Sequence, residues 1–173
     1  MSLASERAGL DAFLERHLWT AGWWKLFAIC IPLAFVVLLA QDALKFGIDL
    51  VLSSLGFPGR MAEVTEFQAN MSWVSPLLIA PVLENLFCLF WVIVLGYKLG
   101  RTWWLVPSMV ALIASAFHVV GYLEPRYASI FANFFAMCCL IHNVRNRVAG
   151  FWASVFLHFL TNFLVLLQFR FQT

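Results

Sequence analysis

Five apolar runs, each close to the length of a membrane-crossing helix, dominate this chain of 173 residues. The runs cover residues 23–42, 72–98, 102–123, 126–143 and 148–169. A helical span needs roughly 20 mainly apolar residues. Apolar residues make up 63% of the chain and charged residues only 12%, whereas a soluble domain has about 25% charged residues and could not hide this much apolar surface. The sequence therefore predicts an all-α integral membrane protein with five transmembrane helices.

The remaining residues are few, so we expect a single membrane domain over residues 1–173. Residues 1–22 carry apolar side chains at helical spacing between charges, which predicts an amphipathic helix on the membrane surface. Residues 43–71 hold a second apolar stripe and the turn sequence at 57–59, which predicts an interfacial segment. Residues 72–170 form the predicted helical core.

The net charge and the cysteines limit which binding partners and cofactors we expect. A net charge of +2 is too small to indicate nucleic acid. The four cysteines lie inside apolar runs without a C-x-x-C pair, which indicates neither a zinc knuckle nor a disulfide framework. We therefore expect the lipid bilayer as surroundings, no nucleic acid and no cofactor.

Three ionisable side chains lie in the middle of apolar runs, namely Glu84, His118 and His158. Each costs about 2.5–3.5 kcal/mol near the bilayer centre, so each needs a function or a partner. Counted from the inner helix ends, they lie at depths of about 21, 24 and 15 Å. Asn162 follows His158 by one turn at about 21 Å, and Asn133 falls near the same level. The sequence thus predicts one polar layer in the outer half of the membrane.

A buried hydrogen-bond cluster between helices would account for the His158–Asn162 pair, but such a cluster does not need the costlier carboxylate of Glu84. Pro81 removes a helical hydrogen bond three residues before Glu84, and the resulting kink favours a cavity. A carboxylate beside a histidine can hold and deprotonate water, and a second histidine with an amide can stabilise an oxyanion. The layer therefore predicts peptide-bond hydrolysis. A metal held by Glu84, His118 and His158 is less favoured, because H-E-x-x-H is absent.

The order of these residues resembles the CPBP family, the CAAX protease and bacteriocin-processing proteins, also called the Abi family of intramembrane glutamic proteases. Its motifs are E-E-x-x-x-R, F-x-x-x-H and, after a helix without a motif, H-x-x-x-N/D. Residues 80–85 (APVLEN) and 114–118 (ASAFH) are similar to the first two motifs, and residues 158–162 (HFLTN) match the third in full. The resemblance covers residues 70–170 and implies a CPBP-like helical core.

By this resemblance, Glu84 activates water, His118 assists it, and His158 and Asn162 form the oxyanion hole. The chain departs from the family at three positions. Asn85 stands where the family has its second Glu, Leu89 replaces the Arg, and Ala114 replaces the Phe. We assign supporting roles to Asn85 and to Asn133.

The predicted function is that of an intramembrane endopeptidase. It would cleave a peptide bond near the membrane boundary of a membrane-anchored protein or peptide, with a water activated by glutamate. Two alternatives remain open at the level of sequence. One is a catalytically inactive relative that binds a membrane partner. The other is a bis-histidine haem protein or a proton-coupled carrier, although the chain lacks the paired halves typical of carriers.

The loops differ in their content of Lys and Arg, which sets the expected orientation. Seven such residues lie on the amino-terminal side and four on the opposite side, the latter being Lys45, Arg60, Arg126 and Arg170. This count predicts an amino terminus in the cytoplasm. We further expect the protein to lie in a bacterial cytoplasmic membrane.

Reporter fusions test this orientation. Fusions at residues 60, 124 and 173 should report the outer side of the membrane, and a fusion near residue 100 should report the inner side. A carboxyl terminus found in the cytoplasm would contradict the prediction.

Overall fold

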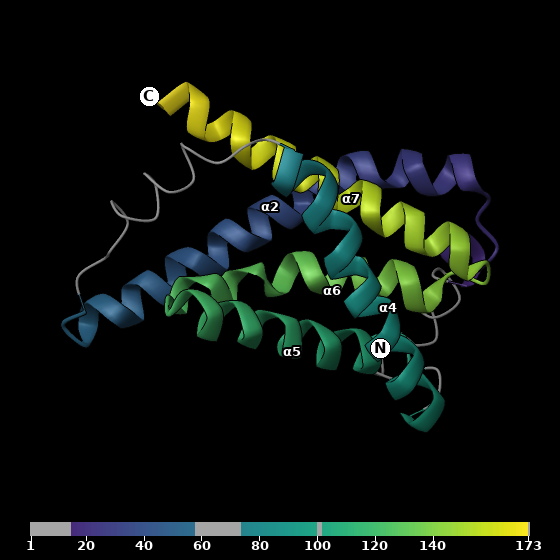
Figure 1. The fold of residues 1–173 in the computed structure, drawn as a ribbon, viewed down its shortest axis with the longest axis horizontal. Helices are drawn as coiled ribbons and strands as arrows, with labels where there is room; N and C mark the ends of the chain where they lie inside the picture. The colour runs from purple at the N-terminus through teal and green to yellow at the C-terminus, as the bar shows by residue number, and fades with distance from the viewer. Residues whose placement is uncertain (1–14, 58–73, 100–101, 173) are drawn as a thin grey trace, which may run out of the picture.

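The computed structural model describes residues 15–57, 74–99 and 102–172, and its regular elements in these ranges are all helices. Along the chain, the elements are the π-helix η1 (Glu15–Trp19), α2 (Trp23–Ser54), the π-helix η2 (Ser75–Ile79), α4 (Ala80–Leu99), α5 (Leu105–Tyr122), the 3-10 helix η3 (Pro125–Ile130), α6 (Phe131–Asn143) and α7 (Arg147–Gln172). Figure 1 shows α6 between α5 and α7, with α4 crossing the bundle. The predicted all-α class is confirmed.

Four helical stretches in the described residues are long and apolar enough to cross a membrane, namely Trp23–Ser54, Ser75–Leu99, Leu105–Tyr122 and Arg147–Gln168. Their outer faces carry large apolar side chains that the bundle does not cover. Leu39, Leu83 and Leu112 are 71%, 60% and 64% exposed. Continuous apolar surface of this kind is suited to the hydrocarbon of a bilayer. The protein is therefore an integral membrane protein.

The fourth predicted span, residues 126–143, has a different structure. Pro125 begins the 3-10 helix η3, and α6 itself has only 13 residues. Seven of those 13 are buried, because α6 packs against α2, α4, α5 and α7. An apolar run has the same sequence signature whether lipid or protein surrounds it. This run forms the central helix of the bundle.

The first helix is longer than expected. It continues to Ser54, so residues 43–54 belong to α2 and do not form a separate interfacial segment. No proline or glycine pair interrupts this stretch, and its charged residues recur at helical spacing. The helix ends where Gly56 adopts a φ of 77° and Phe57 donates its N–H to the carbonyl of Leu52 at 3.0 Å. This is a Schellman ending, for which glycine is the favoured residue.

The predicted amphipathic helix at residues 1–22 is described only from residue 15 onward. There the chain forms η1, which packs against α6. The carbonyl of Trp19 accepts the N–H of Arg145 at 3.1 Å, which ties η1 to the turn before α7. Residues 1–14, and residues 58–71 of the predicted interfacial segment, lie outside the described part of the chain.

Small residues allow α2 and α7 to pack closely. Cys30 and Ala34 on α2 and Ala149 and Ala153 on α7 are all buried. The Cys30 thiol donates to the carbonyl of Ala153 at 3.3 Å. All four cysteines are free, as the sequence predicts.

An ion-pair group fixes the carboxyl-terminal part of α2 to the rest of the bundle. Arg126 in η3 bonds to Asp49 on α2 and, at 3.1 Å, to Glu124. The Glu124 side chain also accepts the backbone N–H of Arg126 and so caps η3.

Gly150 lets the start of α7 approach α6. A Cβ atom at this position would lie 2.6 Å from the carbonyl oxygen of Leu140 and 3.2 Å from the Cβ of Val144. Backbone atoms cannot move aside as a flexible side chain can, so any larger residue must push the two helices apart.

We therefore expect Gly150→Ala to lower the free energy of unfolding by about 1–3 kcal/mol, the usual cost of overpacking. Thermal unfolding in detergent measures this change. Gly47→Ala on α2 is the matched control, because nothing lies within 4 Å of its added methyl group. Equal melting temperatures for Gly150→Ala and the wild type would contradict the close approach.

Candidate active site

Glu84 on α4 faces two histidines from two other helices. Its Oε2 atom lies 3.7 Å from Nε2 of His118 on α5 and 3.9 Å from Nε2 of His158 on α7. The side chain of His158 is 5% exposed, whereas those of Glu84 and His118 are 30% and 23% exposed. The predicted proximity of these three residues is therefore observed. Both distances are too long for a direct hydrogen bond, and the carboxylate remains partly exposed.

The backbone fixes the proton on the His118 ring. Nδ1 of His118 lies 2.9 Å from the carbonyl oxygen of Ala114, one turn earlier on α5. A carbonyl oxygen only accepts, so Nδ1 must carry the hydrogen. Nε2 of a neutral His118 then presents a lone pair to Glu84. The 3.7 Å between Nε2 and the carboxylate is too long for a direct hydrogen bond, so the lone pair faces Glu84 without bonding to it.

Asn85 fixes the opposite tautomer for His158, with the ring hydrogen on Nε2. Its Nδ2 atom lies 2.7 Å from the carbonyl oxygen of Pro81 and 3.3 Å from Nδ1 of His158. The contact with a carbonyl identifies this atom as the amide nitrogen, because an amide oxygen there would face another acceptor. An amide nitrogen donates, so Nδ1 of His158 accepts, and Nε2 carries the hydrogen that faces Glu84.

The position of Asn85 makes this arrangement rigid. The residue is completely buried, and its Nδ2 atom also lies 3.6 Å from the sulfur of Met137 on α6. Its Oδ1 atom is buried with no hydrogen-bond partner among the described residues. An unpaired buried oxygen is unfavourable, so the donor side of the amide is what the site uses. Asn85, which we predicted to be a supporting residue, therefore contacts His158 directly.

Aromatic rings enclose the two histidines. Phe134 on α6 lies 5.3 Å from the His118 ring and 6.3 Å from the His158 ring, measured between centroids. Tyr122 and Tyr127 lie 6.0 and 6.4 Å from His118 and stack on each other at 4.5 Å. These rings are not among the residues that we predicted for the site. Tyr122 follows His118 by one turn, a spacing that could have found it, whereas Phe134 is one of 18 phenylalanines and gives no signal.

Asn162 lies on the same helix as His158 but bonds elsewhere. Its Nδ2 atom donates to the carbonyl of Pro76 in η2 at 2.7 Å. This carbonyl lacks a helical donor for a clear reason. The N–H of Ala80 bonds to Ser75 in the π-helical register, and the next donor in that register would be Pro81, which has no N–H. One hydrogen of the Asn162 amide replaces the missing donor.

Asn133 also bonds away from the three ionisable residues. Its Oδ1 atom accepts from the hydroxyl of Thr161 on α7 at 3.3 Å, and both residues are buried. The pair joins α6 to α7 beside the site. The structure therefore brings Glu84, Asn85, His118 and His158 together and places Asn133 and Asn162 in neighbouring hydrogen bonds.

The described residues contain no group of three His, Cys, Asp or Glu side chains with the spacing of a metal site. The hydrogen on Nε2 of His158 also occupies the lone pair that a metal or a haem iron would need on that atom. The geometry supports proton transfer and hydrogen-bond donation.

Comparisons with family models, with curated proteins and with solved structures find no match to this chain.

The tautomer of His158 can be measured directly. Histidine ¹⁵N NMR of the wild type should show a protonated Nε2 for His158 and a protonated Nδ1 for His118. In Asn85→Asp, the new carboxylate accepts, so we expect the proton of His158 to move to Nδ1.

Asn133→Asp is the matched control, because it makes the same chemical change near His158 without touching its ring. The His158 tautomer should stay as in the wild type. A wild-type spectrum in which Nδ1 of His158 is protonated would contradict the role of Asn85, whether or not either variant folds.

Proposed function

We propose that this protein is an intramembrane endopeptidase that hydrolyses a peptide bond near the membrane boundary of a membrane-anchored protein. The observation that carries the proposal is the pair of histidine Nε2 atoms, 3.7 and 3.9 Å from one Glu84 oxygen, inside a bundle with an apolar surface. A carboxylate in the membrane is costly and marks a functional site. The order of motifs that resembles the CPBP family supports the same reaction.

In the proposed reaction, Glu84 accepts a proton from a water molecule as the water oxygen attacks the carbonyl carbon of the substrate. His118 presents the lone pair of its Nε2 atom toward Glu84 and can assist Glu84 in holding that proton. That proton goes to the leaving nitrogen when the C–N bond breaks, and the products are a carboxylic acid and an amine. The reaction requires neither a serine nor a cysteine nucleophile.

His158 and Asn162 would stabilise the oxyanion by donating hydrogen bonds to it. Asn85 keeps the hydrogen of His158 on Nε2, where it can be donated to the developing negative charge. Asn162 uses one amide hydrogen on Pro76, and the second is the one we assign to the oxyanion. A donor held by the protein before the reaction needs no rearrangement, which is why such donors lower barriers.

The depth of the site suggests the class of substrate. Glu84 lies about 22 Å along α4 from its Leu99 end, and His158 lies about 16 Å along α7 from Arg147. In the predicted orientation both ends face the cytoplasm, so the site is nearer the outer face. We therefore propose an exported, membrane-tethered precursor as the substrate.

Cleavage creates new termini in membrane proteins, and these can be compared without choosing a substrate beforehand. Cells that express the wild type or a variant are compared in this way. We expect Glu84→Gln to remove the base and lower cleavage by about 10²–10⁴. His158→Ala should lower it by about 10²–10³, because an oxyanion donor is lost. Chelators and reagents for serine or cysteine should have no effect.

Asp49→Asn is the matched control for Glu84→Gln. It makes the same acid-to-amide change on α2 and leaves Arg126 its ion pair with Glu124. Full cleavage by Glu84→Gln would eliminate the glutamate mechanism, and strong inhibition by a chelator would replace it with a metal mechanism.

A further inference from the structure

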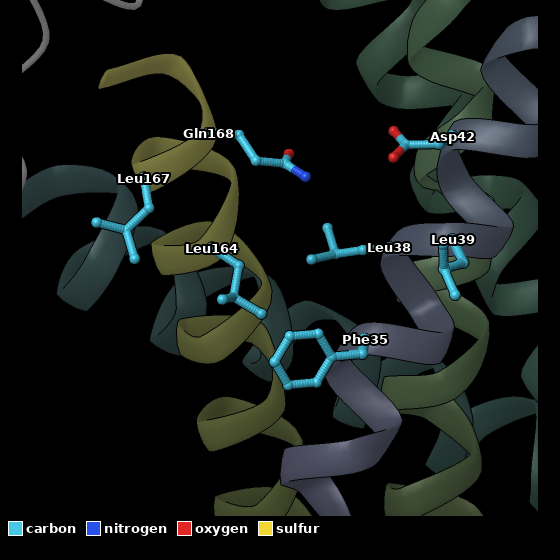
Figure 2. Close-up of a pocket in the computed structure, with 7 residues that line it drawn as sticks. All are labelled: Phe35, Leu38, Leu39, Asp42, Leu164, Leu167 and Gln168. Atoms are coloured by element: carbon cyan, nitrogen blue, oxygen red, sulfur yellow. The ribbon is translucent and has the colours of Figure 1, made fainter. Parts of the chain in front are cut away.

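A groove opens between α2 and α7, separate from the residues of the candidate active site. The two helices contact each other and then diverge toward their carboxyl ends (Figure 1). The groove between them has a volume of about 480 Å³ and is lined by Phe35, Leu38, Leu39, Asp42, Leu164, Leu167 and Gln168. Five of these seven side chains are apolar. The two polar ones stand at the same end, where Asp42 and Gln168 face each other across the gap (Figure 2).

The polar end lies at the expected boundary of the membrane. Asp42 is about 28 Å along α2 from Trp23, and Gln168 is about 31 Å along α7 from Arg147. The hydrocarbon core of a bilayer is about 30 Å thick. The apolar lining therefore lies at the depth of lipid chains, and the polar pair lies at the depth of headgroups.

Neither polar side chain has a partner among the described residues. Asp42 makes no ion pair or hydrogen bond there, in contrast to Asp49 on the same helix, which pairs with Arg126. Gln168 is likewise exposed and unbonded within the described ranges. The carboxylate attracts a cation, and the amide can donate to an anionic oxygen. Together they match a headgroup that carries an ammonium and a phosphate side by side.

We propose that this groove binds a phospholipid whose headgroup carries a primary ammonium, such as phosphatidylethanolamine. Its ammonium would donate to Asp42, its phosphate would accept from Gln168, and an acyl chain would lie against Leu38 and Leu164. The groove extends only about 10 Å from Phe35 to Asp42. A rigid partner helix would contact it over two turns at most, whereas a flexible acyl chain can fill so short a space.

Headgroup selectivity tests the proposal. The full chain is placed in mixed bilayer discs, and the lipids it retains are counted by native mass spectrometry. We expect phosphatidylethanolamine to be retained about tenfold more strongly than phosphatidylglycerol, which has no cation, as for one charge-assisted hydrogen bond. Phosphatidylcholine, whose ammonium has no N–H, should be intermediate. In Asp42→Asn this preference should fall to about one.

Asp49→Asn is the control on the same helix, and it should keep the wild-type preference because Asp49 is already paired. A phosphatidylethanolamine with a photoreactive acyl chain should label residues of the groove, among them Leu38 or Leu164. Equal retention of the three lipids by the wild type, labelling confined to other faces, or a cross-link to a second copy through this groove would each overturn the proposal. These outcomes are independent of Glu84 and of peptide hydrolysis.

Discussion

Backbone carbonyls that lose their helical donors have to find new ones inside a membrane, and this requirement organises the site. Hydrocarbon supplies no hydrogen bonds, so each freed carbonyl needs a side chain. The amide of Asn162 donates to the freed carbonyl of Pro76, and the amide of Asn85 donates to the carbonyl of Pro81 within α4. Because the same Asn85 nitrogen also meets His158, a bond that stabilises α4 sets the proton on a histidine of α7. The same side chain therefore contacts the backbone of α4 and a histidine of the candidate site.

The central helix α6 has a second organising role. It carries no residue of the three motifs, yet it contacts every helix that carries one. Phe134 lies between the rings of His118 and His158, and Met137 lies against Asn85. These buried contacts hold residues from α4, α5 and α7 at fixed positions around Glu84.

The apolar runs predicted the membrane class. The proximity of Glu84, His118 and His158 was also predicted, because the regular rise of a helix gives the depth of each residue. It did not reveal the partners of Asn162 and Asn133. The first depends on the π-helical turn at Ser75–Ile79, which shifts the hydrogen-bond register by one residue, and no simple residue pattern marks such a turn. The second depends on the rotation of α6 against α7. The fourth predicted span forms η3 and α6, and its enclosure by the other helices could not be predicted, because hydropathy does not distinguish lipid from protein as the surrounding medium.

The length of α2 has a consequence for the membrane in which the protein resides. At 32 residues the helix is about 48 Å long, well beyond the thickness of a hydrocarbon core of about 30 Å. A rod of this length must tilt or run into the headgroup region, and the angle it adopts depends on how thick the bilayer is. Arg126 in η3 pairs with Asp49 in the carboxyl-terminal part of that helix, and η3 adjoins α6. The ion pair between Arg126 and Asp49 therefore links the tilt of α2, which depends on bilayer thickness, to the position of η3.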